Sequence, residues 1–167
     1  MSTDTKPGPA IEVDVRGPRF TAWVTSAVLA IALIVSAVSP LAAAVILGVQ
    51  AVIFAIGAVR GPRRHPYGVV FAKLVAPRLG PVTEREPVPP LKFAQLVGLV
   101  FAAAGVLGFA TGVPLLGLIA TGLALVAAFL NAAFGICLGC QLYPLISLPS
   151  RKSQTSSDRK DFVHGSL

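Results

Sequence analysis

Charged residues are scarce in this chain. Asp, Glu, Lys and Arg make up 13% of its 167 residues, whereas 54% of the residues are hydrophobic. An ordinary soluble domain carries about 25% charged residues. The apolar residues also stand in long blocks instead of the short periodic runs that form a soluble core. These two features exclude an ordinary water-soluble domain and indicate an integral membrane protein.

Cysteine and histidine are rarer still. The chain has two cysteines, Cys137 and Cys140, and two histidines, His65 and His164. Two cysteines cannot build the multi-bridge framework of a small extracellular scaffold. A closed zinc site needs four ligands, so it would require His164 from the C-terminal tail as well as His65. We therefore predict no metal site and no other cofactor.

Asp, Glu, Lys, Arg and His are absent from the four longest apolar blocks. A proton-coupled carrier or an ion pump normally needs such a group inside the bilayer, so both classes are disfavoured. The net charge of +7 does not indicate a nucleic-acid-binding protein either, because the cations flank the apolar blocks and no recognition motif accompanies them.

The four apolar blocks have the length of membrane-spanning helices. We predict spans at Phe20–Val38, Leu41–Val59, Phe93–Thr111 and Leu115–Leu138. A helix of about 19 residues reaches about 28 Å, close to the hydrocarbon thickness of about 30 Å. The blocks lack the alternation of barrel strands. The predicted fold class is an all-α integral membrane protein whose four transmembrane helices form two hairpins.

The distribution of charge predicts the orientation. The turns Ser39-Pro40 and Gly112–Pro114 are uncharged, and Lys and Arg flanking membrane spans stay in the cytoplasm. Both termini and the middle loop are therefore expected to be cytoplasmic. All fourteen cations agree with this arrangement: Lys6, Arg16, Arg19, Arg60, Arg63, Arg64, Lys73, Arg78, Arg85, Lys92, Arg151, Lys152, Arg159 and Lys160.

The segments outside the spans have distinct compositions. Residues 1–19 are predicted as a cytoplasmic tail, residues 20–145 as the transmembrane domain with a loop at 60–92, and residues 146–167 as a disordered cytoplasmic tail. Within the loop, Tyr67–Ala76 is expected to be a short helix on anionic lipid, and Pro81–Pro90 a stiff connector.

Small and polar residues inside the spans predict close helix packing. Gly98, Gly105 and Gly112 recur every seven residues, joined by Gly108, so a neighbouring helix can approach this stripe. The main polar groups at membrane depth are expected to form hydrogen bonds between helices. They are Gln50, Gln95 and Asn131.

The Cys137-Leu138-Gly139-Cys140 motif is the candidate for chemistry. If the last span continues through it, the two cysteines share a helix face with Cβ atoms about 5–6 Å apart, longer than the roughly 3.5–4.5 Å of a disulfide. Gly139 can absorb the distortion that a disulfide requires. A disulfide or persulfide carrier, a metal-ligand pair and a structural pair all remain open.

A position at the helix C-terminus would disfavour the thiolate, because the dipole is negative there. Cys140 would lie about 4.5 Å further along the axis than Cys137, closer to the cytoplasm. We therefore expect Cys140 to be the more accessible thiol and Cys137 to be the resolving thiol, with the dithiol form favoured at rest in the cytosol.

Four stretches of the chain together form a recognisable pattern: Val13–Phe20, Gly61–Arg64 with Pro66-Tyr67, Lys92–Gln95 and Phe129–Cys140. They resemble a family of bacterial membrane proteins, domain of unknown function 4395, from about Val13 to Leu145. The resemblance implies a bacterial inner membrane and a role in thiol or sulfur handling beside thioredoxin-like or rhodanese-type sulfurtransferase proteins, carried over only to Cys137 and Cys140. A mild departure is Lys92, where the family pattern suggests arginine.

The predicted function is a thiol-redox or sulfur-transfer accessory in the membrane, with Cys137 and Cys140 as the candidate catalytic residues. The expected partners are membrane lipid and a thioredoxin-like or rhodanese-type protein, with no nucleic acid. The alternative is a non-enzymatic scaffold or a small-solute permeation bundle with structural cysteines. The sequence disfavours an enzyme and does not indicate the oligomeric state.

Overall fold

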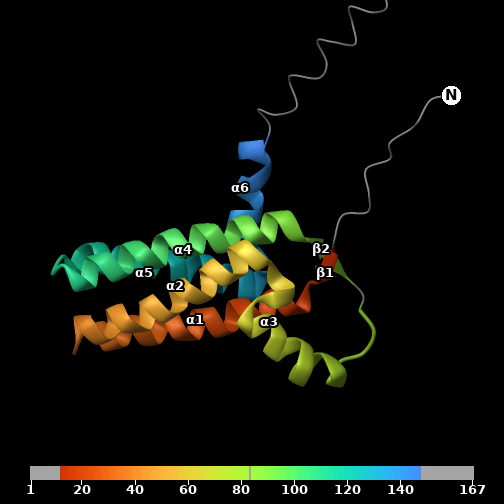
Figure 1. The fold of residues 1–167 in the computed structure, drawn as a ribbon, viewed down its shortest axis with the longest axis horizontal. Coiled ribbons are helices and arrows are strands. Elements are labelled where there is room, and N and C mark those ends of the chain that lie inside the picture. The colour runs from red at the N-terminus through yellow and green to blue at the C-terminus, as the bar shows by residue number, and fades with distance from the viewer. Residues whose placement is uncertain (1–11, 83, 148–167) are drawn as a thin grey trace, which may run out of the picture.

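Four long helices dominate the computed structural model, which describes residues 12–82 and 84–147 (Figure 1). Each is long and apolar enough to cross a membrane. This confirms the prediction of an all-α membrane protein with four spans. The helices are α1 (Arg16–Ser36), α2 (Pro40–Arg60), α4 (Val88–Ala110) and α5 (Pro114–Phe134).

The two hairpins, α1–α2 and α4–α5, lie side by side and form a closed four-helix bundle. Helix α2 packs against α4, and α1 packs against α5. Both tight turns lie at one end of the bundle, which we call the hairpin end (residues 37–39 and 111–113). Proline begins the second helix of each hairpin, and the Ser39 hydroxyl accepts the Ala42 N–H at 3.2 Å. Proline suits this first helical position, where its missing N–H is not needed.

The half of the bundle next to the hairpin end contains the apolar core. Gly108 of α4 lies against the backbone of Gly117 of α5, and Gly105 faces Leu47 and Thr121. The predicted close packing is therefore confirmed at Gly105 and Gly108, and also at Gly98, where an added Cβ would lie 2.9 Å from the Phe54 ring of α2. Gly112 lies in the turn, with nothing within 4 Å of its Cβ position. The core residues are Leu29, Ala32, Ala43, Ala44, Leu47, Phe109 and Ala124.

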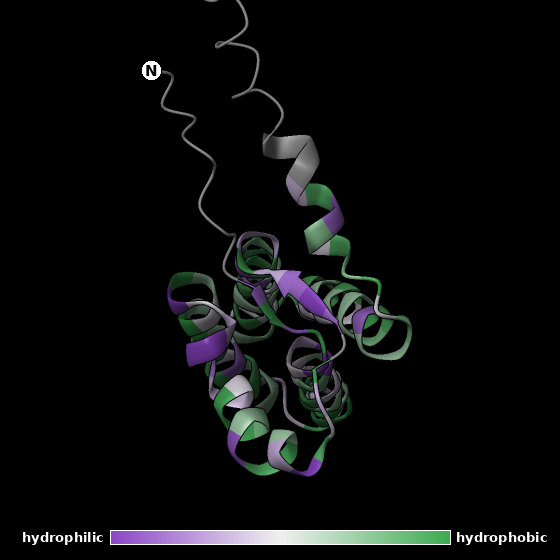
Figure 2. Ribbon diagram, turned by 90° about the vertical axis from the view of Figure 1, so that its right-hand side faces the viewer, coloured by the Kyte–Doolittle hydropathy of each residue, from purple (hydrophilic) through white to green (hydrophobic). Residues whose placement is uncertain are grey.

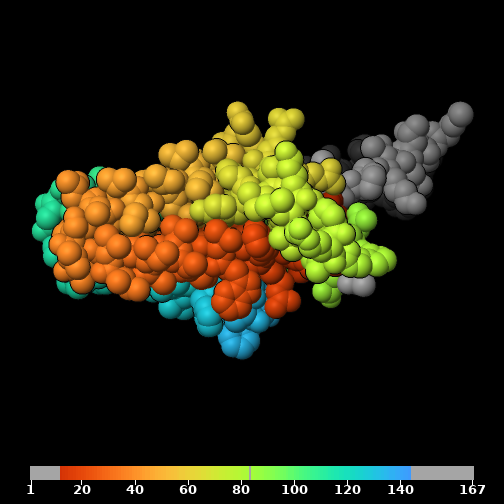
Figure 3. Space-filling model, turned by 90° about the horizontal axis from the view of Figure 1, so that it is seen from below, coloured from red at the N-terminus to blue at the C-terminus, as the bar shows by residue number. Residues whose placement is uncertain are grey.

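The opposite end, which we call the loop end, is formed by residues 61–87 and by α6 (Leu138–Ser147). After the short turn η1 (Pro62–Arg64), the chain is almost continuously helical through α3 (Pro66–Val70), η2 (Phe71–Val75) and η3 (Ala76–Arg78). This agrees with the helix predicted over Tyr67–Ala76. Figure 3 shows this segment in yellow-green beside the start of α1, where buried Phe71 packs on Phe20 with ring centroids 5.7 Å apart.

A two-stranded antiparallel ribbon lies across the helix ends (Figure 2). Strand β1 (Glu12–Asp14) pairs with β2 (Arg85–Pro87), and Val13 lies opposite Glu86. Neither strand is foreseen in the predicted tail 1–19 or in the connector Pro81–Pro90. Their pairing ties the N-terminal segment to the loop, so residues 12–19 belong to the folded domain.

Asp14 connects this ribbon to α1. Its carboxylate accepts the backbone N–H of Arg16 at 3.0 Å and forms an ion pair with the Arg16 side chain at 2.8 Å. These contacts hold the pKa of Asp14 below its ordinary value. The first turn of α1 thereby gains a carboxylate at the end where backbone N–H groups lack partners.

Helix α6 projects sideways from the bundle and packs on α4 (Figure 1). The Tyr143 and Phe93 rings meet with centroids 6.1 Å apart. The predicted tail 146–167 therefore begins inside a helix. Its remainder, residues 148–167, lies outside the described residues, and so does His164.

Candidate functional site

The last membrane helix ends before the cysteines are reached. Gly135 adopts the left-handed conformation with φ 71° and ends α5. The N–H groups of Gly135 and Ile136 donate to the Asn131 and Leu130 carbonyls at 3.1 and 3.3 Å. This pattern is typical of a helix that stops at glycine. The predicted span Leu115–Leu138 is therefore too long, and its last four residues are not part of the helix.

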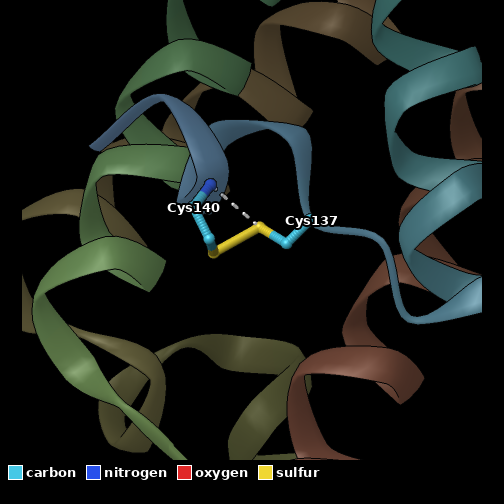
Figure 4. Close-up of a disulfide and its surroundings, with 2 residues drawn as sticks. All are labelled: Cys137 and Cys140. Atoms are coloured by element: carbon cyan, nitrogen blue, oxygen red, sulfur yellow. Dashed lines mark hydrogen bonds between the residues drawn. A yellow bond between two sulfur atoms is a disulfide. The ribbon is translucent and has the colours of Figure 1, made fainter. Parts of the chain in front are cut away.

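Cys137 occupies the residue that precedes α6, at the N-terminus of a new helix. Its carbonyl accepts the Gln141 N–H at 3.1 Å, and its Sγ accepts the Cys140 N–H at 3.3 Å (Figure 4). The prediction that the cysteines lie at a helix C-terminus is wrong. A helix N-terminus carries partial positive charge, which favours a thiolate. Cys137 therefore lies in the environment that favours a thiolate, whereas the sequence led us to expect Cys140 to be the more accessible thiol.

The two cysteines form a disulfide in this structure. Their Cα atoms lie 5.2 Å apart, within the usual range for a disulfide. Because the helix breaks before Cys137, the two cysteines do not lie on one face of the last span, as the prediction assumed. The two sulfurs can therefore come together. Both residues are partly exposed. The structure thus places the pair at disulfide distance, whereas the dithiol is the form expected at rest in the cytosol.

Gly139 seats this motif against the bundle. A Cβ atom at position 139 would lie 2.7 Å from both Cα and Cβ of Ala94 on α4. Real side chains do not approach so closely, so a larger residue would push α6 away from α4. The glycine of the motif therefore fixes the position of the disulfide relative to the membrane helices.

A small cavity of about 250 Å³ adjoins both cysteines. Glu86 of β2 lines this cavity together with Gln141. Burial raises the pKa of the Glu86 carboxyl, the charge of Glu84 adds to the rise, and Arg19 opposes it. Glu86 is a functional candidate that the sequence did not reveal, because the ribbon alone brings it from the loop to the cysteines.

A second cavity, of about 740 Å³, lies inside the loop-end half of the bundle. Apolar residues of all four long helices line most of its wall, and Thr21, Thr25 and Asn131 supply polar groups. Charged residues from outside the spans also line it: Glu12, Asp14, Arg63 and Arg85. Cys137, Leu138 and Gly139 also belong to the wall. The disulfide motif therefore borders a cavity among the membrane-spanning helices as well as the outer surface.

A buried polar cluster lines the same cavity near α4. His65 is 1% exposed, and its neighbour is Gln95. A Cβ added at Gly57 would lie 2.6 Å from the His65 ring and 3.0 Å from the Gln95 side chain, so these three residues meet. Within residues 12–82 and 84–147, neither ring nitrogen of His65 nor Oε1 of Gln95 has a hydrogen-bond partner of good geometry.

The histidine and the glutamines differ from their predicted roles. Burial lowers the pKa of His65 from 6.5 to about 4, with Gln95 opposing the shift, so the ring is neutral at pH 7. Gln50 accepts the Tyr67 hydroxyl at 2.9 Å, a contact with the loop segment and not with another span. Burial raises the pKa of Tyr67. In the described part of the chain, no group of three His, Cys, Asp or Glu residues could hold a metal ion.

These features define a multi-pass membrane protein with a CxxC disulfide at a helix N-terminus, beside a cavity among its spans. The chain belongs to the family described as Domain of unknown function (DUF4395), whose model matches residues 13–147. The match runs from β1 to the end of α6 and includes both cysteines. No curated protein and no solved structure matches the chain.

Proposed function

We propose that this protein exchanges disulfides at the membrane, with Cys137 and Cys140 alternating between disulfide and dithiol. The main support for this proposal is the position of Cys137 at the N-terminus of α6, where its Sγ accepts the Cys140 N–H. That environment favours Cys137 both as an attacking thiolate and as a leaving group. A pair that served packing alone would have no need of this environment.

The exchange proceeds in two balanced steps. A partner thiolate attacks the Cys137 sulfur, so that the Cys137–Cys140 bond breaks, a mixed disulfide forms and Cys140 leaves as a thiolate. The second partner thiolate then attacks the partner sulfur of the mixed disulfide and releases Cys137. Two electrons pass to the protein, and Cys140 takes up a proton. Glu86 lines the cavity beside both cysteines, so its carboxyl is the group that supplies and later accepts this proton.

The partner we propose is a cytoplasmic thioredoxin-like or rhodanese-type protein. Both cysteines are partly exposed, and the cationic residues gather at the same end of the bundle. With a rhodanese-type partner, the Cys137 thiolate would take the outer sulfur of a donor persulfide and release the donor thiolate. Cys140 would then attack the Cys137 sulfur, forming the disulfide and releasing hydrosulfide.

The proposed orientation places the loop end in the cytoplasm of a bacterial inner membrane. It is supported by the uncharged hairpin turns and by the cations of residues 60–92. A reporter enzyme that is active only outside the membrane should be active when inserted after Ser39 and inactive when inserted after Leu79. The reverse pattern would overturn the orientation and would require an extracytoplasmic partner.

Thiol labelling tests the roles of the cysteines. In sealed, inverted vesicles, a charged maleimide should label Cys137 in the Cys140→Ser variant faster than it labels Cys140 in the Cys137→Ser variant, most clearly at pH 6–7, where ordinary thiols are protonated. Equal rates, or faster labelling of Cys140, would contradict the role assigned to the helix N-terminus.

A functional assay distinguishes thiol exchange from the alternative, a scaffold or permeation bundle with structural cysteines. In a host that needs the gene, the Cys137→Ser/Cys140→Ser double variant should lose function at normal membrane abundance. A Ser36→Ala variant, altered at the hairpin end, is the matched control and should retain function. An unchanged phenotype of the double variant would favour the scaffold.

A further inference from the structure

The cavity of about 740 Å³ has the size and the lining of a small-molecule site. Ligand sites of about 300–1,000 Å³ are largely apolar and hold a few polar groups that fix the ligand's orientation. Here the apolar wall comes from the membrane helices, and His65 and Gln95 supply polar groups. A ligand for this cavity should therefore be apolar enough to enter from the bilayer and should carry a small number of polar atoms.

The polar groups are buried without partners. His65 is 1% exposed and lies against Gln95, but neither of its ring nitrogens has a hydrogen-bond partner of good geometry among the described residues, and Oε1 of Gln95 has none either. Buried donors and acceptors are normally paired, so such groups indicate a missing partner. A neutral imidazole offers one donor and one acceptor, and an amide offers both. Carbonyl and hydroxyl oxygens on a ligand would satisfy them.

The polar groups and Cys137 of the disulfide line the same cavity, and α4 contacts the elements that carry both. Gln95 follows Ala94, the residue that Gly139 contacts, and Cys137 is part of the wall. A ring bound through its oxygen to His65 or Gln95 would thus lie in the cavity that the Cys137 sulfur borders. This juxtaposition gives the ligand a chemical role, because a dithiol can be reoxidised only by passing two electrons to an acceptor.

We propose that the cavity binds a membrane quinone, which accepts the electrons of the Cys137–Cys140 dithiol. This inference rests on the proposed thiol exchange and names its electron acceptor. Quinones combine an isoprenoid tail that dissolves in the bilayer with ring carbonyls that can accept the His65 N–H. The hydroxyl groups of the hydroquinone can donate to the unpaired acceptors, which are the second His65 ring nitrogen and Oε1 of Gln95. A phospholipid acyl chain would fill the apolar part but would leave His65 and Gln95 unpaired.

The reaction balances for electrons and protons. The Cys137 thiolate adds to a ring carbon and forms a C–S bond. The Cys140 thiolate then attacks the Cys137 sulfur, so the disulfide forms, the C–S bond breaks and the electron pair stays on the ring. The ring oxygens take up two protons, equal in number to those lost by the two thiols. The products are the disulfide and the hydroquinone, and His65 or Gln95 hydrogen-bonds the reduced oxygen.

The test uses the full-length protein in lipid nanodiscs, reduced and kept anaerobic, with decylubiquinone as the probe. One equivalent of quinone should be reduced per protein, with formation of the disulfide seen by mass spectrometry. Binding of decylubiquinone to the oxidised protein should weaken about tenfold in His65→Leu, and binding of decylubiquinol should weaken about tenfold in Gln95→Leu, the loss expected for one buried hydrogen bond. Gln50→Leu, a matched buried change outside the cavity wall, should bind as the unaltered protein does.

A parallel titration in glutathione buffers, which needs no quinone, separates this inference from the proposed function. If the pair equilibrates with glutathione but neither binds nor reduces decylubiquinone, the quinone site is wrong and thiol exchange stands. If the pair does not react with glutathione, thiol exchange itself is wrong. Recovery of phospholipid alone from the cavity, undisplaced by decylubiquinone, would also overturn the quinone site.

Discussion

The two halves of the bundle use the same four helices in opposite ways. The hairpin-end half buries an apolar core and brings α4 and α5 into backbone contact at Gly108 and Gly117. The loop-end half encloses a cavity of about 740 Å³ and buries His65 and Gln95 without good partners. Both halves lie within helices of similar composition, so hydropathy alone does not distinguish them.

The difference between the two halves indicates that one half stabilises the bundle and the other half holds the candidate site. Close approach of small residues is the main source of helix association in lipid, where no water drives the helices together. Because the hairpin-end half supplies that packing, the loop-end half can hold a cavity and unpaired polar groups, both of which cost stability. Substitutions in the first half should therefore affect folding, and substitutions in the second should affect reactivity and pH response.

The largest effect is expected from Gly108→Ala. Its Cβ would overlap the Gly117 backbone, which cannot move aside as a flexible side chain could. We expect a loss of about 3 kcal/mol or more, the upper range for overpacking. Thermal unfolding in detergent measures it. Gly48→Ala is the control, since nothing lies within 4 Å of its Cβ. Equal melting temperatures for the two variants would show that the halves are not packed differently.

Acid should destabilise the protein through His65. Its pKa is 6.5 ordinarily and about 4 in the folded protein, so the unfolded chain binds a proton first as the pH falls. The contribution of His65 to stability is constant above pH 6.5. As the pH falls from 6.5 to about 4, stability declines by about 3 kcal/mol in all. Unfolding of the unaltered protein and of His65→Gln is compared at each pH. The variant should lack this part of the decline, and identical pH profiles would contradict a buried neutral imidazole.

Gly139→Ala should disturb the site more than the fold. The added Cβ would meet Cα and Cβ of Ala94 at 2.7 Å, so the start of α6 must shift away from α4. We expect a stability loss of about 1–2 kcal/mol and a smaller difference in labelling rate between Cys137 and Cys140. Gly122→Ala on α5, with open space at its Cβ, should leave both unchanged. Unaltered labelling in Gly139→Ala would show that the contact does not position the cysteines.

The smallest effect is expected at the break between α5 and α6. Gly135 has φ 71°, which costs an ordinary L-residue about 1 kcal/mol. Gly135→Ala should lower stability by about this amount, and Gly135→Asn by less, because asparagine tolerates the left-handed region. Thermal unfolding of the two variants shows which of them loses more stability. Equal losses in both variants would show that the conformation of residue 135 does not determine the break.

Sequence and structure agree most closely where local composition is decisive. The four spans, the two hairpins and the short helix near Tyr67–Ala76 follow from apolar length, proline position and loop polarity, all of which are properties of neighbouring residues. The importance of Cys137 and Cys140 as a pair also follows from their spacing alone. Hydropathy remained high through Gly135, however, so the end of the last span was placed four residues too late.

The sequence by itself determined the membrane class, the number of spans and the candidate thiol pair, because continuous apolar runs and residue spacing are local signals. Only the tertiary structure decided that Cys137 begins a helix, that the ribbon carries Glu86 to the cysteines, and that His65 and Gln95 meet at a cavity. Val13 and Glu86 pair across more than seventy residues, and His65 enters the bundle from a loop. Such contacts depend on how the helices close around one another, which no local pattern in the chain records.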